Sequence, residues 1–410
     1  MRRLRRQRGY AVLAVLALAG ALVSSVVYVW SAPRDDELAR ERRSTVALAA
    51  ARDALIGRAA SDDTRPGSLP CPDTDNDGDA DGSFGNCPVY VGRLPWRTLG
   101  LPDLRDGWGE RLWYVLSSRF RDNAGGGVLN SDTPGTYTVK DAAGSVLAAD
   151  APALVIAPGL VVGSQSREGP NALAAAMYLE GENADGDATY ATGPSSAAFN
   201  DRILILGRED LFRAVTARVA KAALIALETY RSAHGYYPAA NPYAAGGPAY
   251  LCDPGAYQGR IPQTINVSTP SSGCTAHADW NASVPELPAW FFNNNWHLLA
   301  HYAVARVCAD TSAGAQSMCA TDAYDASGTS FPGSAPLSIA GVSGNARVLV
   351  IVSGPARSGQ TRPCTDAAQC VDDSANSDGD ALYVKPSRWP GSNDRMAVAC
   401  AAAGPCPAVP

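Results

Sequence analysis

Charge and histidine are scarce in this sequence. Only 18% of its 410 residues are Asp, Glu, Lys or Arg, the net charge is −6, and four histidines are present. A nucleic-acid-binding protein would need a basic face, so the composition argues against nucleic acid as a partner. No CxxC pair occurs, and with so few histidines zinc is a poor explanation for the cysteines.

The usual signatures of catalysis are absent as well. The sequence has no nucleophile elbow Gly-x-Ser-x-Gly, no P-loop and no Gly-x-Gly-x-x-Gly motif. His297 and His301 could face one way on a helix, but the metalloprotease glutamate is missing between them, so we interpret them as packing residues. The sequence therefore predicts a non-enzymatic protein, with an anchored hydrolase as the weakest alternative.

The ten cysteines fall into neighbouring pairs along the chain. An even count with local pairing favours five disulfides, which form in an oxidising compartment, although the connectivity does not follow from sequence. The pairs are Cys71/Cys87, Cys252/Cys274, Cys308/Cys319, Cys364/Cys370 and Cys400/Cys406.

The N-terminal region has the charge pattern of a membrane anchor. A basic leader over 1–9 precedes an uncharged run over 10–30, which is long enough to cross a bilayer as a helix. The positive-inside bias places the leader in the cytoplasm and everything after Trp30 outside. A cleaved secretory signal is the alternative, but the run is longer than a usual signal core. Pro33 is expected to interrupt the helix, and an amphipathic helix follows over 35–60.

A phrase that occurs twice indicates an internal duplication. Each copy has an Asn-x-Asp-Gly-Asp stretch and, 17 residues after its Asn, an Asn-Asp-Arg triplet: Asn183 to Asp187 with 200–202, and Asn376 to Asp380 with 393–395. The strand-like Leu-Val-Ile over 154–156 recurs over 349–351. Trp108 and Tyr114 correspond to Trp296 and Tyr302, with the same interval between them. Because of this repeat, we expect the aromatic cluster around Trp296 to be core and not a ligand site. The pattern predicts an α+β protein of two units, 31–207 and 208–410, each with a long helix packed on a small antiparallel sheet.

Four motifs resemble those of type IV pilin-like proteins, in particular the pseudopilins of type II secretion. The leader ends at Gly9 and the apolar run starts at Tyr10, as in prepilins cut by prepilin peptidase. Asp106-Gly-Trp-Gly with Tyr114 is similar to a D-x-W-G-x-x-x-Y signature, and Gly235-Tyr-Tyr-Pro to a G-x-Y-P turn. The closing acidic loops are similar to a calcium-holding loop near the pseudopilin C-terminus. The resemblance implies a transmembrane helix followed by two tandem pilin-like units.

One departure from the family suggests a particular role. The family's Phe or Met after the cleaved Gly, and the Glu four residues later, are replaced by Tyr10 and Ala14. The resemblance then implies a minor tip or cap subunit of a type II secretion or type IV pilus-like assembly, anchored in a bacterial inner membrane with its bulk in the periplasm. Its partners would be other pilin-like subunits, assembly proteins, the lipid bilayer and prepilin peptidase. A membrane-tethered, calcium-dependent adhesion or binding protein outside any filament is the alternative.

The strongest candidate site is an acidic loop in the first unit. Alternating carboxylates with Gly78 at the tight turn match the first half of an EF-hand loop, whereas the closing glutamate is replaced by Phe84. Like charges this close repel one another unless a cation neutralises them. The loop therefore predicts Ca²⁺, and a solvated acidic loop is the alternative. The expected ligands are Asp73, Asp75, Asp77, Asp79 and Asp81.

The twin closing loops are weaker candidates for Ca²⁺. Oxygen ligands beside turn glycines suit a hard cation, but Asn and Asp also form turns by capping their own backbone. Asp201 and Asp394 could alternatively pair with Arg202 and Arg395, or with Arg167 and Arg362. The expected ligands are Asn183, Asp185, Asp187 and Asp201 in the first loop and Asn376, Asp378, Asp380 and Asp394 in the second.

Overall fold

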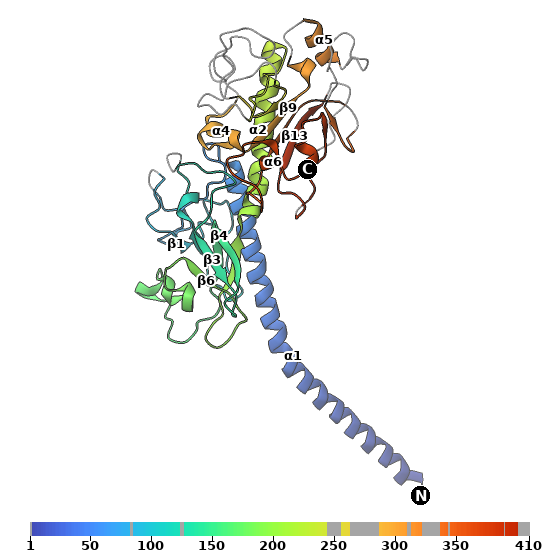
Figure 1. Cartoon of the computed structure of the whole chain (residues 1–410). Helices are drawn as coiled ribbons and strands as arrows, with labels where there is room; N and C mark the ends of the chain where they lie inside the picture. Colours follow the sequence, from blue (N-terminus) through green and yellow to red (C-terminus); the bar gives the residue numbers. More distant parts are fainter. Residues whose placement is uncertain are drawn as a thin grey trace.

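A computed structural model describes most of the chain (Figure 1). The described residues are 2–82, 85–123, 127–243, 256–262, 287–309, 313–321, 337–342, 345–388 and 390–400, and the side chains of the N-terminal helix are described at 16–19 and from 36 onward. Phe84, Cys252, Cys274 and Cys406 lie outside these ranges, as do the side chains of Gly9, Tyr10 and Ala14.

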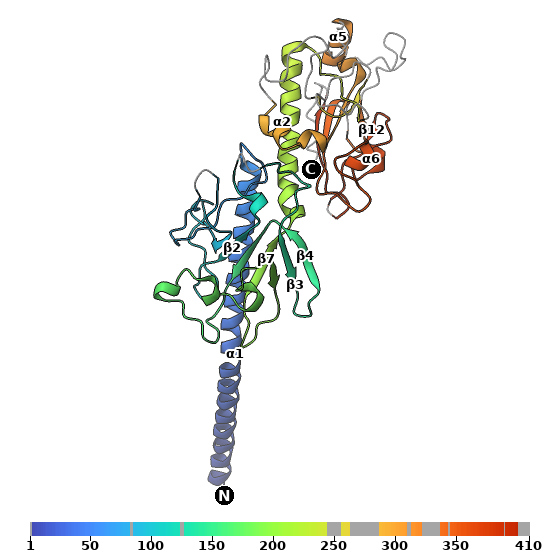
Figure 2. The ribbon, with the colours of Figure 1, turned by 60° about the vertical axis from the view of Figure 1, so that its left-hand side comes forward.

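The longest element is helix α1 (Arg2–Ser61), with 60 residues. Its N-terminal half projects away from the molecule, and its C-terminal half lies against the globular part (Figures 1 and 2). The break expected at Pro33 is absent, since the helix continues through this residue. Proline removes one helical hydrogen bond and crowds the preceding turn, and a helix can absorb both by bending.

The structure contradicts the prediction of a transmembrane anchor over 10–30. Within the described part of the chain, no helix combines the length and the apolar character needed to cross a bilayer. A spanning helix needs about 20 mostly apolar residues, whereas the long described stretch of α1 side chains, 36–61, carries charge from Asp36 to Arg58. The predicted fold class, which started with that anchor, and the predicted single-pass inner-membrane location are corrected accordingly. The architecture is mixed α+β, with several small sheets.

The first half places a four-stranded antiparallel sheet on α1. Its strands have the order β1-β2-β5-β7. Their bounds are β1 Val91–Arg93, β2 Trp113–Leu116, β5 Ala153–Ala157 and β7 Arg202–Leu206. All five residues of β5 are buried, which explains the uninterrupted apolar run in its sequence. Ala51 and Leu55 of α1 are fully buried in the same core.

A smaller sheet and several short helices complete the first half. Strand β3 lies between β4, antiparallel to it, and β6, parallel to it. The bounds are β3 Tyr137–Lys140, β4 Val146–Ala151 and β6 Thr189–Ala191. The 3₁₀ helices are η1 Ser118–Phe120, η2 Gly169–Asn171, η3 Ala175–Met177 and η4 Gly181–Asn183.

The second half repeats the arrangement around helix α2 (Arg208–His234). Its antiparallel sheet has the order β8-β9-β11-β13, with β8 Gln258–Gly259, β9 Ala300–Val304, β11 Ala346–Val352 and β13 Arg395–Cys400. Two short strands, β10 (Ser338–Ile339) and β12 (Leu382–Tyr383), pair in parallel. The other helices in the described part of this half are α4 Ala289–Asn293, η5 Trp296–Leu298, η6 Arg306–Cys308, α5 Ala313–Thr321, α6 Ala367–Cys370 and η7 Ser374–Asn376.

The strand registers of the two sheets correspond. Along each buried central strand, equivalent residues face equivalent neighbours: Tyr114, Val155 and Leu204 in the first sheet, and Tyr302, Val350 and Ala397 in the second. The two tyrosines also make the same bond. Tyr114 donates to the carbonyl of Pro70 at 3.2 Å, and Tyr302 donates to that of Pro238 at 2.7 Å.

The two halves share one hydrophobic core, and α1 and α2 pack on each other. On α2, Phe212 has its ring centroid 6.0 Å from Phe120 of the first half and 6.1 Å from Trp296 of the second. The halves are also joined by polar contacts. The backbone N–H of Leu129 donates to Asn294 Oδ1 at 3.0 Å. The halves are therefore one packed body.

Three of the expected cysteine pairs are disulfides, namely Cys71–Cys87, Cys308–Cys319 and Cys364–Cys370. Each closes a short loop. The first of them encloses the acidic loop of the first half, and the third precedes the closing loop of the second half in the sequence.

Candidate metal centre

The acidic loop over 73–81 is fixed to the first sheet at its start. Asp73 and Arg93, at the end of β1, exchange backbone hydrogen bonds of 3.0 and 2.7 Å. The disulfide Cys71–Cys87 ties the two ends of the loop together. The loop is thus held at its base, and the strand pairing sets the direction in which Asp73 points.

The carboxyl group of Asp73 organises the turn. This residue is fully buried, and its two oxygens accept the backbone N–H groups of Asn76 at 2.6 Å and Gly78 at 2.7 Å. Burial raises the pKa of Asp73, and the neighbouring charges of Asp77 and Asp75 add to the rise, whereas the two hydrogen bonds oppose it. A cation placed against this group would favour its ionised form.

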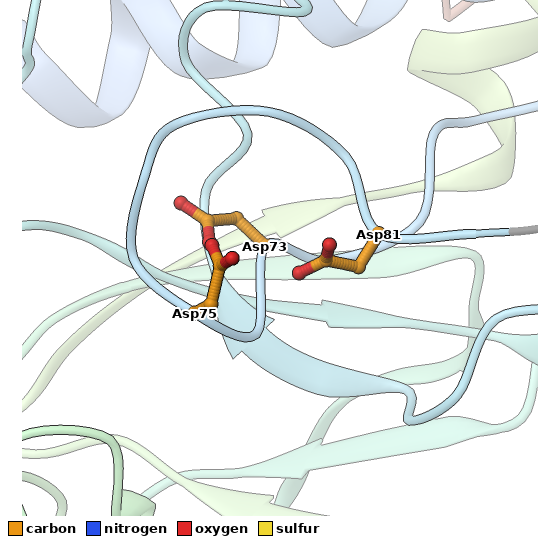
Figure 3. A group of neighbouring side chains, drawn as sticks. All are labelled: Asp73, Asp75 and Asp81. Atoms are coloured by element: carbon orange, nitrogen blue, oxygen red, sulfur yellow. The ribbon is translucent and has the colours of Figure 1, made fainter.

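Three of the five predicted ligands come together. Asp73, Asp75 and Asp81 each offer a carboxylate oxygen, and these oxygens lie within 4.8 Å of one another. Figure 3 shows the three side chains inside the ring of the loop. Asp81 Oδ2 accepts both the backbone N–H and the hydroxyl of Thr74, at 2.5 and 2.6 Å, and these bonds lower the pKa of Asp81. The carboxylate of Asp81 is therefore held in place, and its ionised form is favoured.

The other two predicted ligands have different roles. Asp77 is exposed and caps the backbone N–H of Asp79 at 2.8 Å. Asp79 pairs with Arg97 at 3.0 Å on the surface. The period-two alternation of the sequence predicted five carboxylates around one ion, whereas the turn at Gly78 directs these two away from the other three.

The chemistry of the three-carboxylate group suits a hard divalent cation. Ca²⁺ takes 6–8 oxygen ligands, and backbone carbonyls and water commonly supply those that carboxylates do not. Arg111 approaches the same loop, donating to the side-chain oxygen of Asn76 at 2.9 Å. Its guanidinium also pairs with Asp103 at 2.8 Å, so it offsets only part of the negative charge of the loop.

Replacing Gly78 with alanine is expected to disrupt the loop. Gly78 has φ of +99°, and an added Cβ would lie 2.5 Å from the ring of Trp96. Backbone strain of this kind costs about 1–3 kcal/mol, and the clash adds to it. Urea unfolding followed by far-UV circular dichroism measures the loss. Gly144→Ala is the matched control, because Gly144 also has positive φ but open space around it. Equal losses in the two variants would show that the packing on Trp96 is unimportant.

The twin closing loops do not assemble the predicted ligand sets. The Asn183 side chain accepts from the Ala191 backbone N–H at 2.8 Å, and its amide donates to the Ala191 carbonyl at 3.0 Å and to Asp201 Oδ2 at 2.9 Å. The Asn376 side chain makes the same two backbone bonds with Val384, at 2.8 and 3.1 Å. The exposed Asp185, Asp187, Asp378 and Asp380 cap backbone N–H groups two residues ahead. These are the Asx-type turns that the sequence left open.

One exposed cluster forms nearby, with a different membership from the predicted set. It consists of Glu182, Asp185 and Asp187, whose carboxylate oxygens lie within 4.8 Å of one another. Asp201 is not part of it. In the described part of the second closing loop, no group of three acidic side chains comes within the same distance. The two loops therefore share their turns but differ in their surface carboxylates.

Each closing loop is accompanied by a pair of buried carboxyl groups that was not predicted from the sequence. Asp201 Oδ2 accepts the backbone N–H of Glu180 at 2.9 Å, and Glu180 Oε2 accepts that of Asp201 at 3.0 Å. In the second half, Asp394 Oδ2 accepts the backbone N–H of Asp372 at 2.7 Å. Asp372 and Asp394 thus take the places of Glu180 and Asp201 one unit later in the chain, although the backbone N–H of Asp394 donates to Ser392 Oγ at 3.1 Å.

Both pairs are costly to ionise fully. Burial, with the charge of Glu180 as the second cause, raises the pKa of Asp201 to about 8. Burial and then the charge of Asp372 raise the pKa of Asp394 to about 7. The Oδ1 atoms of Asp201 and Asp394 are buried and have no hydrogen-bond partner within the described residues. A proton or a bound cation at each Oδ1 would satisfy them, since a buried anion without a partner is strongly disfavoured.

The alternative arginine partners lie elsewhere. Arg202 pairs with Glu41 of α1 at 2.5 Å, and Arg167 pairs with Glu110 at 3.3 Å. In the second half, Arg362 lies 4.0 Å from Asp132 of the first half, and Arg395 donates to the backbone carbonyl of Asp394. None of these arginines forms an ion pair with the buried aspartates in the part of the chain that the structure describes.

The two histidines are not on one helix. His297 lies in η5 and His301 in β9, and both are buried. His301 Nδ1 is 3.1 Å from the hydroxyl of Tyr243, and its other ring nitrogen is 3.4 Å from that of Tyr383. Burial lowers the pKa of each histidine to about 4, so both are neutral packing residues.

Comparison with known proteins adds nothing to this geometry: no family model, no curated protein and no solved structure matches the chain.

Proposed function

We propose that this protein is a non-enzymatic, calcium-stabilised minor subunit of a pilin-type assembly, of the type II secretion or type IV pilus kind. It acts by binding other subunits through α1 and by presenting its globular part at the end of the assembly. The sequence motifs described above, with the leader ending at Gly9, are what suggest this class.

The observation that carries the proposal is the projecting half of α1. Helices in proteins owe most of their stability to packing of an apolar face and little to their own hydrogen bonds in water. Leu16 and Leu18 on this stretch are 63% and 64% exposed. Such a helix favours a function in which other helices cover it, and assembly supplies them.

The globular part favours a terminal position over one within a shaft. It contains two helix-and-sheet halves fused into one core (Figure 2), so each subunit would carry about twice the usual bulk. In a helical array the heads of successive subunits must fit side by side, which a double head obstructs. The absence of a catalytic motif in the sequence agrees with a structural role.

Cleavage by a prepilin peptidase tests the proposal. Co-expression of the full chain with such a peptidase is expected to yield a protein that begins at Tyr10 with a methylated amine, as read by intact-mass and N-terminal peptide analysis. Gly9→Leu is the control and should remain uncut. A wild-type protein that keeps residues 1–9 under conditions where a known prepilin is fully cut would contradict the proposal.

Calcium should raise the melting temperature of the protein. A ligand that binds only the folded state at 100 times its Kd adds about 2.7 kcal/mol of stability. Differential scanning fluorimetry with calcium and with a chelator measures the difference. The double variant Asp75→Asn, Asp81→Asn should lose most of it, whereas Asp141→Asn, which changes a turn carboxylate of the β3–β4 hairpin, should keep it. A melting temperature indifferent to chelator would rule out a stabilising calcium site.

A further inference from the structure

The segment Asp106-Gly-Trp-Gly is braced directly against α1. Asp106 Oδ1 accepts the backbone N–H of Trp108 at 2.8 Å. The backbone N–H of Gly107 donates to Ser44 Oγ at 2.9 Å. A Cβ at Gly107 would lie 2.1 Å from the carbonyl oxygen of Arg40, so only glycine permits this contact. The backbone of Trp108 is thereby fixed next to the helix.

Trp108 faces an open hollow of about 440 Å³ between this segment, α1 and the loop that precedes β7. It is only half-buried, whereas Trp296, its equivalent in the second half, is fully buried. Both halves therefore have a tryptophan at this position, but the ring is buried in the core in the second half and partly exposed in the first. Core packing explains Trp296 and leaves the exposed part of the Trp108 ring unexplained.

Three carboxylates and one guanidinium line the same hollow, from Asp36, Glu37, Glu41 and Arg40 of α1. Glu41 is already paired with Arg202 at 2.5 Å. Asp36 and Glu37 have no ion-pair partner among the described side chains. Arg40 lies one helical turn after Asp36 and offsets part of the charge. The rim remains negative overall, beside an accessible indole.

We propose that this hollow binds the cationic side chain, arginine or lysine, of a partner polypeptide. The negative face of an indole attracts a cation, and the carboxylates of Asp36 and Glu37 accept charge-assisted hydrogen bonds from it. Guanidinium suits the site better than ammonium, because it is planar, less strongly hydrated and stacks on aromatic rings. An anionic ligand would be repelled by the carboxylates.

The place of the hollow explains why the cation would belong to a polypeptide. Of the α1 residues that line the hollow, Asp36 and Glu37 are the nearest in sequence to the N-terminal half of the helix, which projects from the globular part (Figure 1). A chain that runs alongside the projecting helix therefore passes this rim. The inference does not depend on the proposed function, because a partner of this kind need not be a subunit of a filament.

Fluorine NMR of the full chain labelled with 5-fluorotryptophan tests the proposal. Trp108→Phe identifies the Trp108 resonance by its loss. N-acetylarginine amide is expected to shift that resonance in a saturable way, with N-acetyllysine amide weaker. N-acetylcitrulline amide has nearly the same shape without the charge, and it should bind about two- to fivefold more weakly or not at all.

Acidic variants separate charge from simple contact with the ring. Asp36→Asn with Glu37→Gln should weaken arginine binding about two- to fivefold. Asp53→Asn, which removes a 67% exposed carboxylate on the same helix but outside the hollow, should leave it unchanged. Equal shifts with citrulline and arginine, a Trp108 resonance that does not respond, or full binding by the acidic double variant would each overturn the proposal.

Discussion

Phe212→Ala is expected to lower the free energy of unfolding by about 3–5 kcal/mol. The side chain is fully buried, and it contacts Phe120 from one half and Trp296 from the other. Its removal leaves a cavity at the junction of both halves. Guanidinium unfolding followed by far-UV circular dichroism measures the loss.

The same experiment tests whether the two halves unfold together. Because one core runs through both, the wild-type protein should show a single transition, and Phe212→Ala should move that whole transition. Ile225→Ala is the control on the same helix, since Ile225 is 53% exposed and surface changes usually stay within about 0.5 kcal/mol. Two separate transitions, of which Phe212→Ala moves only one, would contradict a shared core.

Much of the secondary structure could be predicted from the sequence. The strands β5 and β11 were visible as short apolar runs, because a strand buried on both faces has no polar residue to interrupt it. The long helix expected in the second unit, 208–410, corresponds to α2, which ends at His234 with Gly235 in the left-handed conformation after it. These signals depend on residues that are close together in the sequence, so the helices and strands that they mark can be predicted from the sequence alone.

The errors arose where tertiary context decides. Pro33 was expected to end a helix, and α1 continues through it. The apolar run over 10–30 predicted an anchor that the described structure does not support. The fusion of the halves also had no sequence signal. Asn294, for example, joins the halves through two hydrogen bonds: its side-chain oxygen accepts the backbone N–H of Leu129, and its backbone carbonyl accepts Asn130 Nδ2. The partners lie far apart in the sequence, so no local motif indicates either bond.

The candidate site was found only in part for the same reason. Spacing located the acidic loop but could not tell that the turn at Gly78 separates Asp77 and Asp79 from the other carboxylates. Glu180 and Asp372, the partners of Asp201 and Asp394, were missed because they are different residue types and stand at different distances from their aspartates in the sequence. Glu180 precedes Asp201 by 21 residues, and Asp372 precedes Asp394 by 22. Aligning the two units residue by residue therefore does not pair Glu180 with Asp372, although the backbone N–H of each donates to the buried aspartate of its own unit.

The buried carboxyl pairs predict that the protein loses stability as pH rises. In the unfolded chain an aspartate has a pKa of about 3.9, whereas in the folded protein the pKa is about 8 for Asp201 and about 7 for Asp394. Between these values the folded state binds more protons, so the free energy of unfolding falls with increasing pH. This stabilisation is fully present below the unfolded pKa and is lost by pH 8 at Asp201 and by pH 7 at Asp394. The slope is at most about 1.4 kcal/mol per pH unit for each site.

Urea unfolding from pH 5 to pH 8.5, in the presence of a chelator, measures this slope. Asp201→Asn and Asp394→Asn should each flatten it and raise stability at the alkaline end, because an amide keeps the accepting oxygen and has no charge to bury. Asp187→Asn, an exposed carboxylate in the first closing loop, should leave the slope unchanged. If calcium occupies these pairs, adding it at pH 8 should restore the stability of the wild-type protein but not that of the two buried variants, since the ion then replaces the missing proton. Unchanged slopes in both buried variants would show that the pairs stay ionised in the folded protein.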